Sequence, residues 1–296
     1  MTTIETTKPL HSAATDPGRH ADLLAELPGD PARLPEIVSG FVLHPWLAGQ
    51  RDVTMTAEHD ADRQSRSMTV LLDRLLARDD RPLTQRRAAK DRFFGTCRDY
   101  ALVTCSILRH HGHNARIRCG FADYFTPDFL EDHWVAEVWS ADGWRMVDAE
   151  LDAVTIADMG TTFPADDVPR ERFMTAPQAW RDVRSGKLDP DTMGVSFIGI
   201  SGLWFAAASV CRDLASLYGV ELLPWDYWDE PEQLMLDDGC LKNHLDRIDD
   251  LAEAMMAATA GASMPDKTDL WPTWLSWPQT LSSYTGGDPV RVDLND

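Results

Sequence analysis

The spacing of apolar residues changes at Gly112, and this change constrains the fold more than any other feature of the sequence. Residues 101–108 carry apolar side chains at three- and four-residue steps, which is typical of a helix with one buried face. Residues 116–121 instead alternate between apolar side chains and arginine or glycine, which is typical of a strand. A glycine is well placed to end the helix between these two segments.

Two further strands are predicted at residues 132–139 and 144–151, joined by a tight turn at residues 140–143. One helix followed by antiparallel strands predicts an α+β fold. Further helices are predicted at residues 63–77, 203–218 and 241–258 from their apolar spacing.

No convincing linker divides the chain. Residues 1–35 are rich in Thr, Asp and Pro, and we expect a flexible segment there with at most one short helix at residues 20–26. Residues 36–296 are expected to form a single domain, with a core at about 65–152 and a helical C-terminal addition at about 153–296.

The charge of the chain restricts its partners. The formal net charge is −20 over 296 residues, so nucleic acid and anionic membranes would be repelled. The most apolar run, Val195 to Cys211, is too short and too interrupted to span a bilayer. Residues 1–10 lack the basic and apolar regions of a secretion signal. The five cysteines show no paired spacing, so we expect free thiols and a cytoplasmic protein.

Cys97 occupies a position that would favour a thiolate. Thr96 is a plausible N-cap for the helix that follows, which would put Cys97 in its first turn. A thiol reacts with carbonyls only as the thiolate, and the positive end of a helix stabilises that anion. The same N–H groups are suited to stabilise an oxyanion.

His133 and Asp148 lie on the two strands of the predicted hairpin. If Ser140 pairs with Gly143, Asp148 lies diagonally beside His133 on the same face, at a separation of roughly 7 Å between Cα atoms. A turn centred on residues 142–143 would separate them unless a bulge intervenes. The triad hypothesis therefore requires one particular register. Cys97, His133 and Asp148 would then be nucleophile, base and orienting acid.

The other cysteines and histidines have simpler interpretations. Cys105, Cys119, Cys211 and Cys240 are expected to be small buried hydrophobes. The histidine tract at residues 110–113 has no cysteine or carboxylate at ligand spacing, so no metal is predicted there. Cys97, His133 and Asp148 could themselves bind zinc, but the thiol at a helix start and the His–Asp pair on strands fit nucleophilic catalysis better.

Four blocks of sequence resemble the transglutaminase-like superfamily of bacteria. They are Gly95-Thr96-Cys97-Arg98-Asp99-Tyr100-Ala101, then Arg109 with Gly112-His113-Asn114-Ala115-Arg116, then His133-Trp134-Val135-Ala136-Glu137-Val138, and Gly143-Trp144 with Val147-Asp148. The resemblance covers about residues 65–152. It implies a papain-type Cys-His-Asp triad of Cys97, His133 and Asp148, on a helix and an adjoining antiparallel sheet.

The chain departs from the usual family pattern at two places. Trp134 follows His133 directly, where a small residue usually intervenes, and Ala149-Glu150 follows Asp148, where proline is common. Both changes bear on the shape of the acyl pocket. The second oxyanion donor is not placed by the sequence, and Trp46 and Gln50 are only guesses for it.

Polar and aromatic residues near the triad are candidates for substrate contact, with core packing or ion pairing as the simpler alternative for each. They are Arg118, Asp132, Trp134, Glu137 and Trp225.

The sequence therefore predicts a cysteine-dependent acyltransferase or hydrolase that forms an acyl-thioester intermediate. Its substrate would be a small molecule or peptide with an amide, ester or thioester carbonyl. No cofactor and no metal are expected. The alternative is a non-catalytic binding module that kept the fold. The acyl donor, the acceptor and the oligomeric state are not specified by the sequence.

Overall fold

The computed structural model describes residues 11–294, which form a mixed α+β structure. The expected α+β class is confirmed. Residues 1–10, where a secretion signal was not expected, lie outside the described residues. The chain divides into two compact units. Unit 1 comprises residues 1–117 and 135–168, and unit 2 comprises residues 118–134 and 169–296.

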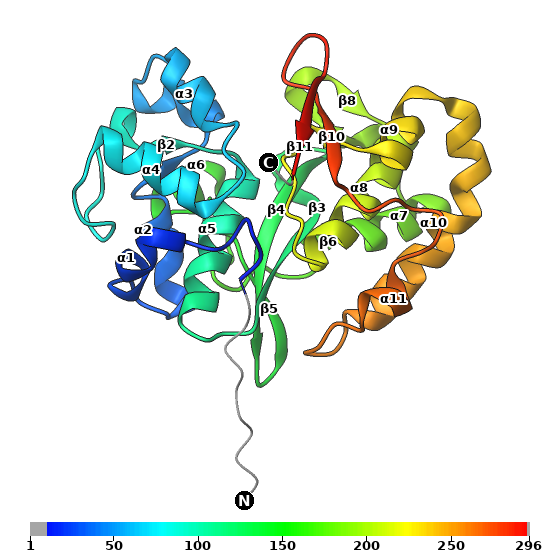
Figure 1. Ribbon diagram of the computed structural model, residues 1–296, viewed down its shortest axis with the longest axis horizontal. Helices are drawn as coiled ribbons and strands as arrows, with labels where there is room; N and C mark the ends of the chain where they lie inside the picture. The colour runs from blue at the N-terminus through cyan, green and yellow to red at the C-terminus, as the bar shows by residue number, and fades with distance from the viewer. Residues whose placement is uncertain (1–10, 295–296) are drawn as a thin grey trace, which may run out of the picture. The chain divides into compact units, whose positions relative to one another are not determined.

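The central element of unit 1 is helix α5, Cys97–His110, and every residue from Cys97 to Arg109 is buried. Three helices pack against it, namely α1, Ala21–Ala25, α2, Leu34–Val38, and α4, Met68–Arg78 (Figure 1). The α-helices and strands of unit 1, besides parts of β3 and β4, are α1 Ala21–Ala25, α2 Leu34–Val38, β1 Val42–Leu43, α3 Ala57–Asp62, α4 Met68–Arg78, β2 Phe93–Phe94, α5, β5 Gly143–Val147 and α6 Ala153–Met159. Short 3-10 helices lie at Gly18–His20, Pro31–Arg33, Pro45–Leu47, Gly49–Arg51 and Ala89–Asp91.

The N-terminal segment is more structured than its composition indicated. Between residues 11 and 35 the chain forms α1, two 3-10 helices and the start of α2. Leu24 and Leu34 are fully buried, and Ser106 of α5 donates a hydrogen bond to the carbonyl of Thr15 at 2.7 Å. In its described part, the segment that was expected to be flexible therefore forms short helices that bury Leu24 and Leu34.

Strands β3, Ala115–Thr126, and β4, Phe129–Ser140, contribute residues to both units. The sheet also includes β6, Phe173–Thr175, β7, Met193–Val195, and β8, Ile200–Ser201. The strand order is β6-β3-β4-β7-β8, and β5 pairs with β4. In unit 1 the β4–β5 pairing is antiparallel and places Ser140 opposite Gly143 and Ala136 opposite Val147. This is the register that the triad hypothesis required, with a two-residue turn at Ala141–Asp142.

The alternation seen at residues 116–121 does not separate a buried face from an exposed one. Residues 115–122 are all buried, including Arg116 and Arg118. Only glycine fits at position 120, because a Cβ there would lie 2.1 Å from the carbonyl oxygen of Met174 on the neighbouring strand. Strand β3 therefore packs on both faces, and its two arginines need buried partners.

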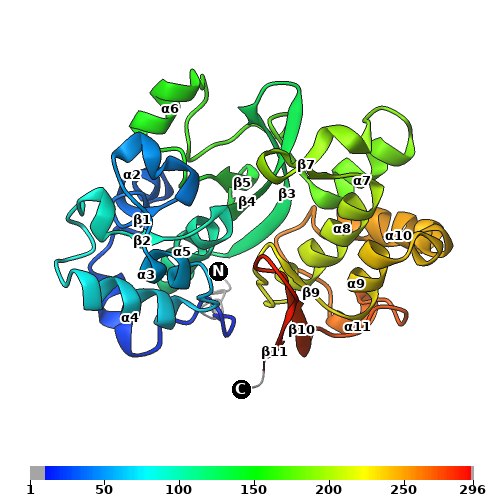
Figure 2. The ribbon, with the colours of Figure 1, turned by 90° about the horizontal axis from the view of Figure 1, so that it is seen from above.

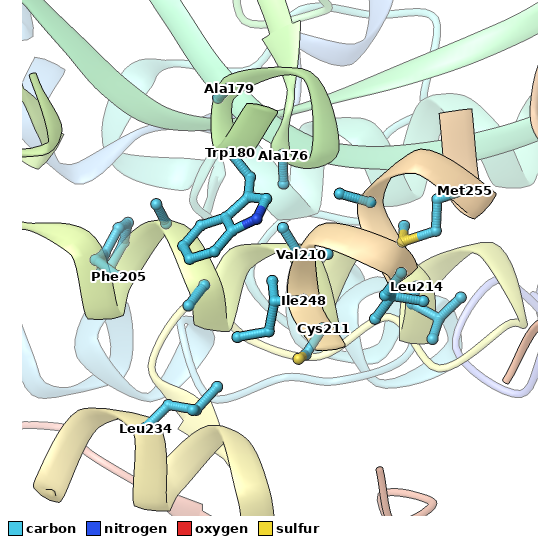
Figure 3. Packing of buried hydrophobic residues seen from close by; sticks show 14 of the residues in the cluster. Ala176, Ala179, Trp180, Phe205, Val210, Cys211, Leu214, Leu234, Ile248 and Met255 are labelled. Atoms are coloured by element: carbon cyan, nitrogen blue, oxygen red, sulfur yellow. The ribbon is translucent and has the colours of Figure 1, made fainter. Parts of the chain in front are cut away.

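Unit 2 is built around helices α7, Ala176–Arg184, α8, Leu203–Leu217, and α10, Asp238–Ala258, which pack against one another (Figure 2). The predicted helices at 203–218 and 241–258 correspond to α8 and α10. Trp180, Val210 and Ile248 meet in the buried apolar cluster that these helices share (Figure 3).

Unit 2 also contains strands that the sequence analysis did not predict. The C-terminal addition was expected to be helical, yet β9, β10 and β11 form a three-stranded antiparallel sheet in the order β11-β10-β9. The remaining elements of unit 2 are β6 Phe173–Thr175, β7 Met193–Val195, β8 Ile200–Ser201, β9 Asp226–Tyr227, α9 Asp229–Leu236, α11 Lys267–Leu270, β10 Thr280–Ser283 and β11 Val290–Asp293, with 3-10 helices at Pro190–Thr192 and Ser196–Ile198. The domain boundaries at residues 35 and 152 stay predictions. Between residues 11 and 294 no helix is both long and apolar enough to cross a bilayer.

The packing of α10 makes a testable prediction. Ile248 is fully buried in the cluster that α10 shares with α7 and α8, whereas Glu253 is exposed on the same helix. Because Ile248→Ala leaves a cavity, it is expected to lower the free energy of unfolding by about 2–5 kcal/mol in urea titrations followed by circular dichroism. Glu253→Ala is the matched control and should change that free energy by less than about 0.5 kcal/mol. Equal effects of the two changes would contradict this packing.

Candidate active site

Cys97 is the first residue of α5, as the sequence predicted, and its side chain is buried. Thr96 is the N-cap residue, and the Asp99 carboxylate in the first turn of α5 caps it in return. It accepts hydrogen bonds from the Thr96 backbone N–H at 2.8 Å and from the Thr96 hydroxyl at 3.4 Å. Arg98 donates to the other oxygen of Asp99 at 3.0 Å. Burial raises the pKa of Asp99 above its ordinary value, against the opposing effect of Arg98.

The loop before Cys97 is fixed by β1. Strands β1 and β2 pair in parallel, and the Gly95 N–H donates to the carbonyl of Leu43 at 3.2 Å. The Tyr100 hydroxyl donates to the carbonyl of Val42 at 3.1 Å. Gly95 has no room for a side chain, because a Cβ would lie 2.7 Å from the Cβ of Asp99. These contacts hold the N-terminus of α5, and with it Cys97, against strand β1.

Asp148 follows the last residue of β5 and is also buried in unit 1. Its N–H donates to the carbonyl of Ala165 at 2.8 Å, and one carboxylate oxygen accepts from the N–H of Glu150 at 3.0 Å. The backbone of Asp148 is therefore held by the segment that follows α6, and one of its carboxylate oxygens by the neighbouring Glu150.

The contact of Glu150 gives a structural reason for the sequence Ala149-Glu150 after Asp148, where proline is common in the family. Its carboxylate accepts a hydrogen bond from the Trp46 indole N–H at 2.7 Å, across 104 positions of sequence. Trp46, one of the two guesses for an oxyanion donor, thus already donates its indole proton in this structure. A proline two residues after Asp148 would not provide this acceptor.

His133 lies on the part of β4 that belongs to unit 2 and is buried among aromatic rings. Its ring centroid lies 4.7 Å from that of Phe125, 5.9 Å from that of Tyr124 and 6.2 Å from that of Phe173. These three rings were not predicted as site residues, and the contact of His133 with Phe173 on β6 has no local signal because it joins distant segments of the chain. They restrict the rotation of the imidazole.

Two of the candidate substrate residues form buried ion pairs. In unit 2, Arg118 donates through Nε and Nη2 to both carboxylate oxygens of Asp213, at 3.0 and 2.6 Å. In unit 1, Arg116 donates to Glu137 at 2.6 Å and stacks over the ring of Trp144 at 3.8 Å. Because Arg118 and Glu137 are both buried, their contacts fit the alternative of ion pairing.

The other three candidates all belong to unit 2. Asp132 lies 3.9 Å from the guanidinium of Arg212, and burial raises the pKa of its carboxyl. Trp134 is 1% exposed, so it packs in the interior. Trp225 is half-buried, and its carbonyl accepts from the N–H of Tyr284 at 2.9 Å.

Three of the four remaining cysteines have the burial expected of small hydrophobes, whereas Cys240 is half-buried. Cys105, Cys119 and Cys211 are fully buried, and burial raises the pKa of Cys211 to about 12. His111 lies at the end of α5 with Nε2 3.2 Å from the carbonyl of Leu24. Over residues 11–294 no group of three or more His, Cys, Asp or Glu side chains is arranged to hold a metal ion.

The comparisons with known proteins identify a family for part of the chain. Residues 49–149 match the family model of the transglutaminase-like superfamily, so the chain carries a transglutaminase-like domain over about a third of its length. This confirms the resemblance, and the matched segment includes Cys97, His133 and Asp148. Members of this superfamily are commonly enzymes. Searches of curated proteins and of solved structures returned no significant match.

The buried pair of Arg118 and Asp213 makes a second prediction. Arg118→Ala leaves a buried carboxylate without its cation, and we expect a loss of about 3–5 kcal/mol in unfolding free energy, measured in urea. In the double variant Arg118→Met with Asp213→Asn, the neutral amide still accepts from the Cys119 N–H, and most of the stability should return. A stable Arg118→Ala variant would instead favour a role in substrate contact.

Proposed function

We propose that this protein is a cysteine-dependent acyltransferase or hydrolase, with Cys97 as nucleophile, His133 as base and acid, and Asp148 as the residue that orients His133. The substrate is a small molecule or peptide with an amide, ester or thioester carbonyl. The observation that carries this proposal is the position of Cys97 at the start of α5, inside the segment that matches the transglutaminase-like superfamily.

Three further features support the assignment. The N-terminal end of α5 carries a positive partial charge, which stabilises a thiolate and a developing oxyanion. The pairing of Ser140 with Gly143 is the register from which the sequence argument derives a His133–Asp148 contact. The carboxylate of Asp148 already has one oxygen held by the N–H of Glu150.

The reaction would proceed in two halves. His133 takes the proton of the Cys97 thiol, and the sulfur attacks the carbonyl carbon to form a tetrahedral oxyanion. When this collapses, the leaving amine, alcohol or thiol takes the proton from His133, and an acyl thioester remains on Cys97. Water or an amine then attacks the thioester, gives a proton to His133 and releases the acyl group. Water makes the reaction a hydrolysis, and an amine makes it an acyl transfer.

The alternative is a binding module without catalysis. Binding requires neither a reactive thiol nor a nearby imidazole, so the reactivity of Cys97 separates the two functions. Nothing about the fold itself favours one over the other, because the same fold can support both.

Alkylation of Cys97 by iodoacetamide should be rapid well below the ordinary thiol pKa of about 8.5, because His133 and the helix start stabilise the thiolate. In His133→Ala the reaction should need a pH near that value. The rates are measured by mass spectrometry of peptides after labelling at each pH.

Cys240 provides the control within the same chain. It is half-buried, and burial together with Asp237 and Glu230 raises the pKa of its thiol, so its labelling should begin only at higher pH in both proteins. If Cys97 and Cys240 label in parallel, and His133→Ala changes neither, Cys97 is an ordinary thiol and the binding module is the better assignment.

An acyl intermediate makes a separate prediction. With p-nitrophenyl acetate, the protein should release a burst of nitrophenol of about one equivalent, and mass spectrometry should find the acetyl group on Cys97. His133→Ala should slow the burst by about 10²–10⁴-fold. Cys97→Ala should abolish it, and an equal burst in that variant would contradict the assignment. Hydroxylamine as second substrate then shows whether an amine competes with water.

A further inference from the structure

A cavity of about 470 Å³ lies within unit 2, and nothing in the proposed triad uses it. Its lining residues come from β3, the β3–β4 turn, β4, the segment around β6 and the residues before β7. All of them belong to unit 2. Its volume is in the range of roughly 300–1,000 Å³ that is usual for small-molecule sites.

The floor of the cavity is apolar. Phe121 on β3 is fully buried and lies opposite Met174 on β6 in the strand pairing. Leu130 on β4 and Leu188 are half-buried and also line the cavity. The half-buried side chains of Leu130, Met174 and Leu188 would give a ligand an apolar surface to bury, which is the main source of affinity in such sites.

The rim of the cavity is acidic. Asp128 and Glu171 line it and are exposed, and neither has a hydrogen bond or ion pair with another residue in the range 11–294. The third carboxylate, Asp123, is paired with Arg172 at 2.6 Å, so this pair is close to neutral. Two negative charges that are not compensated therefore lie among the apolar side chains that line the cavity.

We propose that this cavity binds an amphipathic amine, with its apolar body against Leu130, Met174 and Leu188 and its ammonium group at Asp128 and Glu171. A carboxylate ligand would meet the two rim charges unfavourably. A neutral ligand of the same shape would gain the apolar contacts alone. Because the carboxylates are exposed, the ammonium group keeps part of its hydration and avoids the cost of burying a charge.

Asp128 holds a backbone conformation that is suited to a conservative test. Its φ of 56° lies in the left-handed region, and it forms the two-residue turn between β3 and β4 together with Pro127. Asparagine adopts this region as readily as aspartate, so Asp128→Asn removes the charge without a backbone penalty. Glu171 is exposed, so Glu171→Gln is equally conservative. The double variant should fold as the unchanged protein does.

The test is calorimetric titration of the full chain with 4-phenylbutylamine, 4-phenylbutan-1-ol and 4-phenylbutyrate. The amine should bind at least about tenfold more tightly than the alcohol, and added salt should narrow this difference, because exposed charges are screened. Asp128→Asn with Glu171→Gln should weaken amine binding to the level of the alcohol. Binding of the alcohol should be unchanged, which also shows that the variant is folded and its cavity intact.

Two controls test whether the tighter binding of the amine depends on the charges of Asp128 and Glu171 and not on the net charge of the protein or on Cys97. Asp250→Asn with Glu253→Gln removes the same charge from exposed residues of α10 that do not line the cavity, and should leave amine binding unchanged. Cys97→Ala should also leave it unchanged, so this result is independent of the proposed catalysis. The proposal is overturned if no amine binding is detected at millimolar concentration, if amine and alcohol bind equally, or if the α10 variant weakens binding as much as the rim variant.

Discussion

The position of α5 depends on the charges that it buries. Arg98 donates to the carbonyl of Arg66 at 2.7 Å, and Arg109 donates to the carbonyl of Ala115 at 2.9 Å and to the hydroxyl of Thr15 at 2.9 Å. A buried charge without partners is costly, so these distant segments must meet the helix at fixed places along its axis. Sliding or rotating α5 would break these contacts at both of its ends. The position of Cys97, the first residue of α5, therefore depends on the hydrogen bonds of these buried arginines as well as on apolar packing.

The elements that could be predicted from sequence are those with strong local signals. The start of α5 was predicted from Thr96 and the apolar spacing, and its end from Gly112, which has a φ of 83°. The β4–β5 hairpin was predicted from two apolar runs and a turn, and Ser140 does pair with Gly143. These features depend on neighbours within a few residues, which is why a single sequence is enough to find them.

The features that could not be predicted depend on contacts between distant residues. The alternation at 116–121 is typical of a half-exposed strand, but Glu137 and Asp213 allow Arg116 and Arg118 to be buried. The hydrogen bond from Trp46 to Glu150 likewise has no local signal. Strands β9, β10 and β11 have two to four residues each, too few to show a period. The cavity collects residues from five segments, and only the fold brings them together.

A second cysteine, Cys240, has surroundings that partly resemble those proposed for Cys97. Cys240 is the third residue of α10 and lies 3.6 Å from Nδ1 of His244, so it too has a helix start and an imidazole beside it. That Nδ1 is 2.8 Å from the Cys240 carbonyl, which can only accept, so it carries a proton and cannot take the one from the thiol. Burial, together with the charges of Asp237 and Glu230, also raises the pKa of this thiol.

At the start of α5 the nearby acid, Asp99, is instead paired with Arg98 at 3.0 Å. A helix N-terminus and a histidine are therefore not sufficient. The balance of charge around the helix start is what would make Cys97, rather than Cys240, the nucleophile that we propose.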